Sequence, residues 1–194
     1  MVKEKILELG EGLFLARGYT GFSYADIADR LNIRNAAIHY HFPSKRDLLN
    51  TIVKKQQHQF LKWTDQKRAE NNHFPDLLRQ TIDYVYTVRL NAGHQVCAIG
   101  NSAVSAMILP EETLQVIRSM VHDIINWFEE ILSKGKKSGS FYFLGHSKDK
   151  ASLIAASLAG ALQIARLAGE NHFHIIAENI ITELCHNPQQ IHEG

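Results

Sequence analysis

Apolar residues near the start of the chain recur every three or four positions, which is the spacing of one helix face. These positions are Val2, Ile6, Leu9 and Leu13. The pattern predicts a helix that ends at Gly18, a residue suited to the left-handed end of a helix. Ser23 with Asp26 three residues later predicts a capped second helix, and a short third helix follows over residues 35–41.

The same spacing continues along the rest of the chain. It predicts helices over residues 44–67, 75–91, about ten residues from 96, 111–132, 149–168 and 171–186, with turns at 92–95 and 134–140. The helix over 111–132 is apolar nearly all round, which predicts a central, buried position. We find no useful strand alternation and no repeat. The expected fold is therefore all-α, with about nine helices.

Residues 24–42 have the shape of a helix-turn-helix, in which the second helix enters the major groove of DNA. Ala28 is small where the two helices cross. Asn32 tolerates the left-handed conformation that a tight turn needs. Ile38 is apolar where the third helix must pack on the first two. Together the three positions favour a DNA-binding head.

The stretch "NAAIHYHF" (35–42) admits a metal, catalytic, core or recognition role. His39 and His41 are two positions apart, so on a helix they point in divergent directions and do not form a chelating pair. Core burial suits Ile38 and Phe42, which lie four apart, but not His39 and Tyr40. An exposed recognition surface is the reading that fits the polar side chains.

We expect this surface to contact DNA through alanines that allow close approach and through polar side chains that reach phosphates or base edges. Lys45, at the start of the fourth helix, is expected to bind the phosphate backbone as a point charge. The predicted DNA-binding residues are Ser23, Tyr24, Arg34, Asn35, Ala36, Ala37, His39, Tyr40, His41 and Lys45.

The charge distribution supports this division of the chain. The net charge is only +1, but residues 1–68 hold 12 Lys and Arg against 7 Asp and Glu, whereas the remainder holds 9 against 13. A basic first third on an acidic body favours a head that faces nucleic acid. A chance fluctuation of surface charge gives the same numbers.

The stretch "FSYADIADRLNIRNAAIHYHFPSKRDLL" resembles the DNA-binding head of TetR-type (tetracycline-repressor-like) transcriptional regulators. The resemblance covers about residues 5–52 and rests on Ile27-Ala28, the run from His39 to Phe42, and Lys45. It implies a helix-turn-helix domain over 1–47 and a ligand-sensing, dimerising helical domain over 48–194.

Two positions depart from the family pattern. Arg34 stands where the family usually has a Ser or Thr that caps the third helix, which leaves Asn32 or Asn35 to cap it. His39 stands where the family usually has an aromatic residue. These departures leave DNA binding expected and the operator sequence unknown.

The last two predicted helices are rich in small and apolar residues, as in "LIAASLAGALQIARLAG". Packed against their two-fold mates, they would form a four-helix interface. The alternative is that these faces fill the core of one chain. We favour a homodimer, because a groove-reading head needs a second copy to bind two half-sites.

Polar and aromatic residues on the apolar helices of the body mark a candidate effector site. They are Trp63, Tyr84, Arg89, Cys97, Asn101, Ser105, Trp127 and Gln163. Such a lining suits a mostly apolar small molecule with one or two hydrogen-bonding groups. Each residue is alternatively an ordinary core or surface residue, and Cys97 is either a sensor of oxidants or electrophiles or a small buried hydrophobe.

The expected function is a repressor that a small-molecule effector releases from its double-stranded DNA operator. The alternative is a helical enzyme with its site in the body, although we find no catalytic triad, phosphate loop or zinc motif. No cofactor or metal is expected. Two cysteines make no disulfide framework, and the most apolar run (151–165) is too short to span a bilayer, so we expect a cytoplasmic protein without membrane contact.

Overall fold

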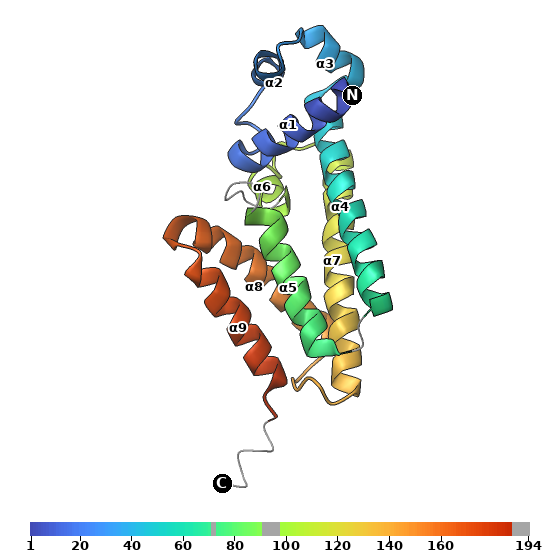
Figure 1. Ribbon diagram of the computed structural model, residues 1–194, viewed down its shortest axis with the longest axis vertical. Coiled ribbons are helices and arrows are strands. Elements are labelled where there is room, and N and C mark those ends of the chain that lie inside the picture. The colour runs from blue at the N-terminus through green and yellow to red at the C-terminus, as the bar shows by residue number, and fades with distance from the viewer. Residues whose placement is uncertain (71–72, 91–97, 188–194) are drawn as a thin grey trace. The chain divides into compact units, whose positions relative to one another are not determined.

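The computed structural model describes the chain except residues 71–72, 91–97 and 188–194. The described part is all-α, without strands, which confirms the predicted fold class (Figure 1). Its helices are α1 Val2–Arg17, α2 Tyr24–Leu31, α3 Asn35–His41, α4 Lys45–Glu70, α5 Phe74–Leu90, α6 Ala98–Val104, α7 Glu111–Lys137, α8 Ser147–Ala168 and α9 Asn171–Cys185.

The chain forms two compact units. The first contains the described residues of 1–60 and 92–121, and the second those of 61–91 and 122–194. Helices α1, α2 and α3 pack on one another in the first unit, and α6 packs on α1. In the second unit α8 and α9 lie side by side as an antiparallel pair, and α5 packs on α9 (Figure 1).

The helix ends of the first unit follow local capping rules. Gly18, with φ of 73°, ends α1, and its N–H donates to the Phe14 carbonyl at 2.8 Å. The Ser23 hydroxyl accepts from the Asp26 N–H while the Asp26 carboxylate accepts from the Ser23 N–H at 2.7 Å. The predicted boundaries of α1 and α2 are confirmed.

Apolar side chains from four helices fill the core of the first unit. Its fully buried members are Ile6, Phe14, Ile27, Ile38, Leu48 and Ile52. Gly10 lets α4 approach α1 closely, since a Cβ at this position would lie 2.9 Å from the Leu48 side chain. Because Ile38 of α3 packs into this core, the opposite side of α3 faces solvent.

Helix α7 extends to Lys137, into the stretch 134–140 that was expected to be a turn. Two contacts explain the difference. Lys134 pairs with Glu130 one turn earlier at 2.7 Å. Gly135 lies against the buried ring of Phe141, and a Cβ at position 135 would come within 2.2 Å of that ring. Because this contact forms inside the last turn of α7, the chain reverses only after Gly135.

The predicted central burial of α7 holds for one face. Met120, Trp127, Phe128, Ile131 and Leu132 are buried, whereas Ile117, Val121, Ile124 and Ile125 are half-buried. Helix α6 is shorter in the described structure than the ten residues expected, and its predicted start at Val96 and the turn at 92–95 lie outside the described residues.

Helix α8 corrects the expectation drawn from the run 151–165. The helix continues past both ends of the run to 22 residues, and it is the one described helix whose length and composition would allow it to cross a membrane. Core helices of soluble proteins have the same property. Here one face of α8 is buried, through Ala151, Ile154, Leu158, Ala161, Leu162 and Ala165.

Candidate nucleic-acid interface and effector site

The α2–α3 pair has the geometry of a helix-turn-helix. Asn32 takes the left-handed conformation, with φ of 51°, and is the one non-glycine residue with positive φ in the described chain. The Ile33 N–H donates to the Ala28 carbonyl at 3.0 Å, which closes the turn. Ala28 and Ile38 are buried. The three positions that predicted this motif therefore lie where the motif needs them.

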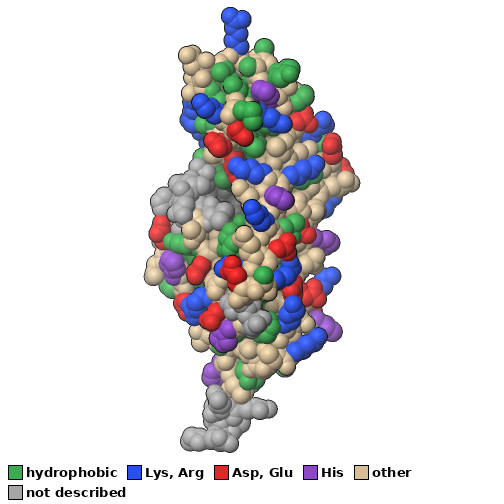
Figure 2. Space-filling model, turned by 45° about the vertical axis from the view of Figure 1, so that its right-hand side comes forward, with side chains coloured by type: hydrophobic (Ala, Val, Ile, Leu, Met, Phe, Trp, Pro, Cys, Tyr) green, Lys and Arg blue, Asp and Glu red, His purple; other side chains and the backbone are tan. Residues whose placement is uncertain are grey.

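Helix α3 presents its polar side to solvent. Asn35, Ala36 and His39 are exposed, and Tyr40, a large aromatic residue, is 83% exposed. Ala37 and His41 are half-buried. Figure 2 shows hydrophobic, histidine and basic side chains close together at the end of the first unit that carries these helices. An exposed aromatic beside histidines is typical of a surface that binds a partner.

Arg34 is the N-cap residue of α3, and no side chain caps this helix. The expectation that Asn32 or Asn35 takes the capping role is wrong, because Asn32 ends α2 and Asn35 is already the first residue of α3. The Arg34 carbonyl accepts from the Ala37 N–H at 2.9 Å. The exposed guanidinium of Arg34 stays available for a phosphate or a base edge.

Tyr24 ties the start of α2 to the end of α3. Its hydroxyl donates to the Phe42 carbonyl at 2.9 Å, and burial raises the pKa of the phenol well above its ordinary value. The Tyr24 ring meets the His39 ring edge-on, with centroids 4.9 Å apart. Ser23 is likewise engaged, because its hydroxyl donates to the Asp26 carboxylate at 2.6 Å.

Lys45 is held by the connection between α1 and α2. Its ammonium donates to the Phe22 carbonyl and lies 4.1 Å from the centre of the Phe22 ring and 4.9 Å from that of Tyr19. Burial lowers the pKa of Lys45, an effect that the charge of Asp26 opposes. Phe22 and Tyr19 lie more than twenty residues from Lys45, and no local sequence pattern predicts these contacts. The structure therefore gives Lys45 an internal role that the sequence did not indicate.

Three predicted effector residues come together in the second unit. The Trp63 and Tyr84 rings stack with centroids 4.4 Å apart, and Trp127 meets Trp63 edge-on at 6.2 Å. The Trp127 indole N–H donates to the Thr81 hydroxyl at 3.1 Å. These residues form an aromatic cluster in which the indole N–H of Trp127 is already hydrogen-bonded.

The other predicted effector residues are dispersed. Asn101 belongs to the first unit, where its buried amide donates to the Phe14 and Leu15 carbonyls at 2.9 and 2.8 Å. Ser105, also in the first unit, is buried just after α6. Gln163 is half-buried on α8. Cys97 and the side chain of Arg89 lie outside the described residues.

A cavity of about 160 Å³ in the second unit adjoins Trp127. Its lining includes Arg68, Glu130 and Lys134, none of which the sequence had singled out. The Arg68 guanidinium lies 4.9 Å from the Trp127 ring and 2.8 Å from the Glu130 carboxylate. Hydrogen bonding between the two raises the pKa of Arg68 and lowers that of Glu130.

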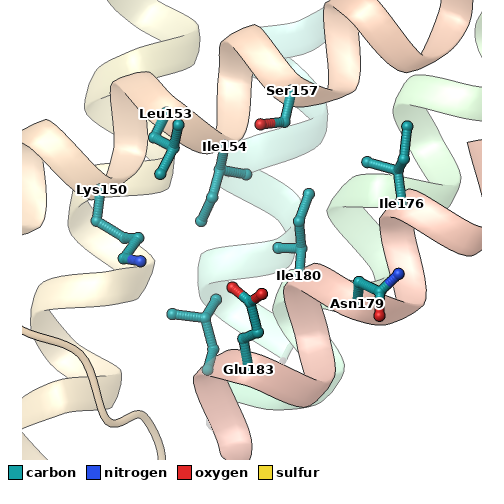
Figure 3. Close-up of a pocket in the computed structure, with 9 residues that line it drawn as sticks. Lys150, Leu153, Ile154, Ser157, Ile176, Asn179, Ile180 and Glu183 are labelled. Carbon is teal, nitrogen blue, oxygen red and sulfur yellow. The ribbon is translucent and has the colours of Figure 1, made fainter.

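A second cavity of about 200 Å³ lies between α8 and α9 (Figure 3). Leu153 and Ile154 of α8 face Ile176 and Ile180 of α9 across it. Its lining also contains polar and charged side chains, namely Lys150, Ser157, Asn179 and Glu183, so this groove on the helix pair predicted to dimerise is only partly apolar. Among the described residues, no three His, Cys, Asp or Glu side chains are grouped so that they could hold a metal ion.

Comparison with known proteins shows which family the region from α1 to the start of α4 resembles. Residues 6–52 match the family model described as bacterial regulatory proteins, tetR family. The negative transcriptional regulator IcaR of the biofilm operon icaADBC, from Staphylococcus aureus, is 40% identical over 53 residues. That match covers 27% of this chain and 28% of the length of IcaR, so it concerns the head alone.

Solved structures extend the similarity to nearly the whole chain. A TetR-family transcriptional regulator from Agrobacterium tumefaciens is 28% identical with a TM-score of 0.89, and a TetR transcriptional regulator from Legionella pneumophila is 27% identical with a TM-score of 0.85. Each alignment covers 95% of this chain and 97% of the other. The family consists of regulators and not of enzymes. With the helix-turn-helix and its exposed third helix, these matches show that the chain belongs to the tetR family of bacterial regulatory proteins.

Proposed function

We propose that the protein is a repressor that binds a double-stranded DNA operator as a homodimer and is released by a small-molecule effector. Residues 1–47 would form the DNA-binding head and residues 48–194 the effector-binding and dimerising body. The observation that carries the proposal is the exposed polar face of α3, with Tyr40 83% exposed on a helix-turn-helix. IcaR, which is similar in this region, is a negative regulator by name.

The exposed side of α8 supports a homodimer through the last two helices. Leu153, Ile164 and Leu167 recur at helical spacing and are 58%, 45% and 88% exposed. Ile175 of α9 adds a fourth exposed apolar side chain. Because the opposite face of α8 already packs into the core, the single chain does not need this apolar stripe to form its core. A second copy covering it also accounts for the apolar character of α8 without a membrane.

The second unit supplies the surroundings for an effector. Trp63, Tyr84 and Trp127 offer aromatic faces, and the cavity beside Trp127 has charged groups in its lining. Such a site suits a largely apolar molecule with one or two polar groups. An effector lowers operator affinity only if it binds the DNA-incompetent conformation more tightly. Because the matched family consists of bacterial regulatory proteins and the proposed partner is DNA, the protein would act in the cytoplasm.

Salt-dependent binding to selected DNA tests the head. The purified protein is expected to enrich one sequence from a randomised duplex pool, with affinity that falls steeply as salt increases. Tyr40→Ala and Arg34→Ala should each weaken binding, and thermal unfolding should change little because both side chains are exposed. Gln66→Ala, which changes an exposed and uncharged side chain of α4 outside the proposed head and dimer interface, is the control. Unchanged operator binding by the Tyr40→Ala, Arg34→Ala double variant would contradict the proposal.

A further inference from the structure

His39 has a fixed hydrogen-bonding partner. Its Nδ1 atom lies 3.1 Å from the carbonyl oxygen of Pro43, four residues later. A carbonyl oxygen accepts hydrogen bonds and cannot donate them. The hydrogen of the neutral imidazole must therefore reside on Nδ1, which selects one of the two tautomers.

The orientation of the ring is fixed as well. Tyr24 contacts it edge-on, at an interplanar angle of 68°, and Tyr24 is itself anchored by the bond from its hydroxyl to the Phe42 carbonyl. The imidazole is thus restrained from two sides although it is exposed to solvent. A side chain already held in one orientation loses little freedom when a partner binds.

In the neutral ring of His39, the outward nitrogen is consequently an acceptor. In the Nδ1–H tautomer, Nε2 carries a lone pair and points away from Pro43, on the other side of the ring. No residue in the described part of the chain donates a hydrogen bond to Nε2. The α3 surface therefore presents an acceptor at a position where the flanking Arg34 and Tyr40 present donors.

We infer that His39 is a specificity-determining residue whose Nε2 accepts a hydrogen bond from the exocyclic amino group of an adenine or a cytosine in the major groove. The inference rests on the proposed function. In the major groove only adenine N6 and cytosine N4 donate, whereas guanine N7 and O6, thymine O4 and the phosphates accept. Neutral His39 matches the first two groups and repels the others.

Duplexes that lack single amino groups test this assignment. The protein first selects its sequence from a randomised duplex pool. Each selected adenine is then replaced by purine, which lacks the N6 amino group, and each cytosine by pyrimidin-2-one, which lacks the N4 amino group. At one position in each half-site, the loss of the amino group should weaken binding about fivefold, the effect of one hydrogen bond. Which replacement has this effect tells adenine from cytosine.

The variant His39→Phe provides the comparison. It keeps an aromatic ring for the contact with Tyr24 and removes both nitrogens, and thermal unfolding checks that it folds. Removal of the amino group at the sensitive position should leave its affinity unchanged. The control is His58→Phe, at an exposed histidine of α4 that is not among the predicted DNA-binding residues. This control should keep the same sensitive position as the wild-type protein.

Three results would overturn the inference, and each has a different meaning. If His39→Phe weakens binding to all sequences equally and lowers the salt dependence, His39 contacts a phosphate as a doubly protonated ring. If the wild-type protein selects no sequence and shows no salt-dependent duplex binding, the proposed function itself fails. Operator binding with no position sensitive to His39 refutes base recognition alone.

Discussion

Replacing Asn101 tests whether this residue holds the first unit together or serves an effector. Its buried amide donates to two carbonyls in the last turn of α1, those of Phe14 and Leu15. Phe14 keeps a second partner, the Gly18 N–H at 2.8 Å. The Leu15 carbonyl lies in the last turn of α1, where helices leave carbonyls without an intrahelical donor.

The expected cost follows from these bonds. Two hydrogen bonds contribute about 1 kcal/mol each, and a buried acceptor left without a donor costs about 1–3 kcal/mol. Asn101→Ala should therefore lower the free energy of unfolding by about 2–3 kcal/mol. Asn101→Asp removes both donors and places a carboxylate against two carbonyl oxygens, so it should be more destabilising at neutral pH. Protonation restores one donor, and the deficit of the Asp variant should shrink in acid.

Urea denaturation followed by far-ultraviolet circular dichroism measures both variants against the wild-type protein. Ser105→Ala, a neighbouring buried polar residue, is the control for a change at this end of α6. If Asn101→Ala lowers the free energy of unfolding by less than about 0.5 kcal/mol, which is the range of ordinary surface substitutions, the two hydrogen bonds do not stabilise the fold. Asn101 would then return to the candidate effector residues.

Three further changes follow from the described contacts. Lys45→Met should destabilise the head while the salt dependence of operator binding stays nearly constant. If the number of ions released on binding, taken from the slope of log affinity against log salt, falls by about one, Lys45 contacts a phosphate instead. Leu167→Glu should shift the protein from dimer to monomer in sedimentation experiments, and an unchanged dimer would place the interface elsewhere. The hydrogen bond from Arg68 depresses the pKa of Glu130. The ion pair therefore stabilises the folded state at pH values above the ordinary carboxyl pKa, and this stabilisation is lost as the pH falls through the depressed pKa. Glu130→Gln should cost at most about 1 kcal/mol at pH 7 in chemical denaturation, and the difference should vanish in strong acid.

The ends of α1 and α2 were predictable because they depend on neighbouring residues. The Ser23 and Asp26 cap, the left-handed Asn32 and the stop at Gly18 each involve groups within a few positions. The outward face of α3 was predictable for a related reason. Ile38 and Phe42 define its buried side, so the polar residues between them must face solvent.

Contacts between distant segments were not predictable. Asn101 is 87 residues from Phe14, and its polar side chain on an apolar helix looks the same whether it binds a ligand or a carbonyl. Lys45 has the spacing of a phosphate-binding residue, but its partners on the α1–α2 connection depend on how the helices pack. The end of α7 was missed because Phe141 folds back onto Gly135.

The exposed apolar stripe of α8 also bears on how strongly the response depends on the amount of protein in the cell. If two copies must meet over Leu153, Ile164 and Leu167 before the heads engage two half-sites, the concentration of the binding species rises with the square of the protomer concentration when dimers are scarce. Halving the amount of protein would then reduce the dimer about fourfold. The stripe would thereby make operator occupancy steeply sensitive to protein dosage, even without any effector.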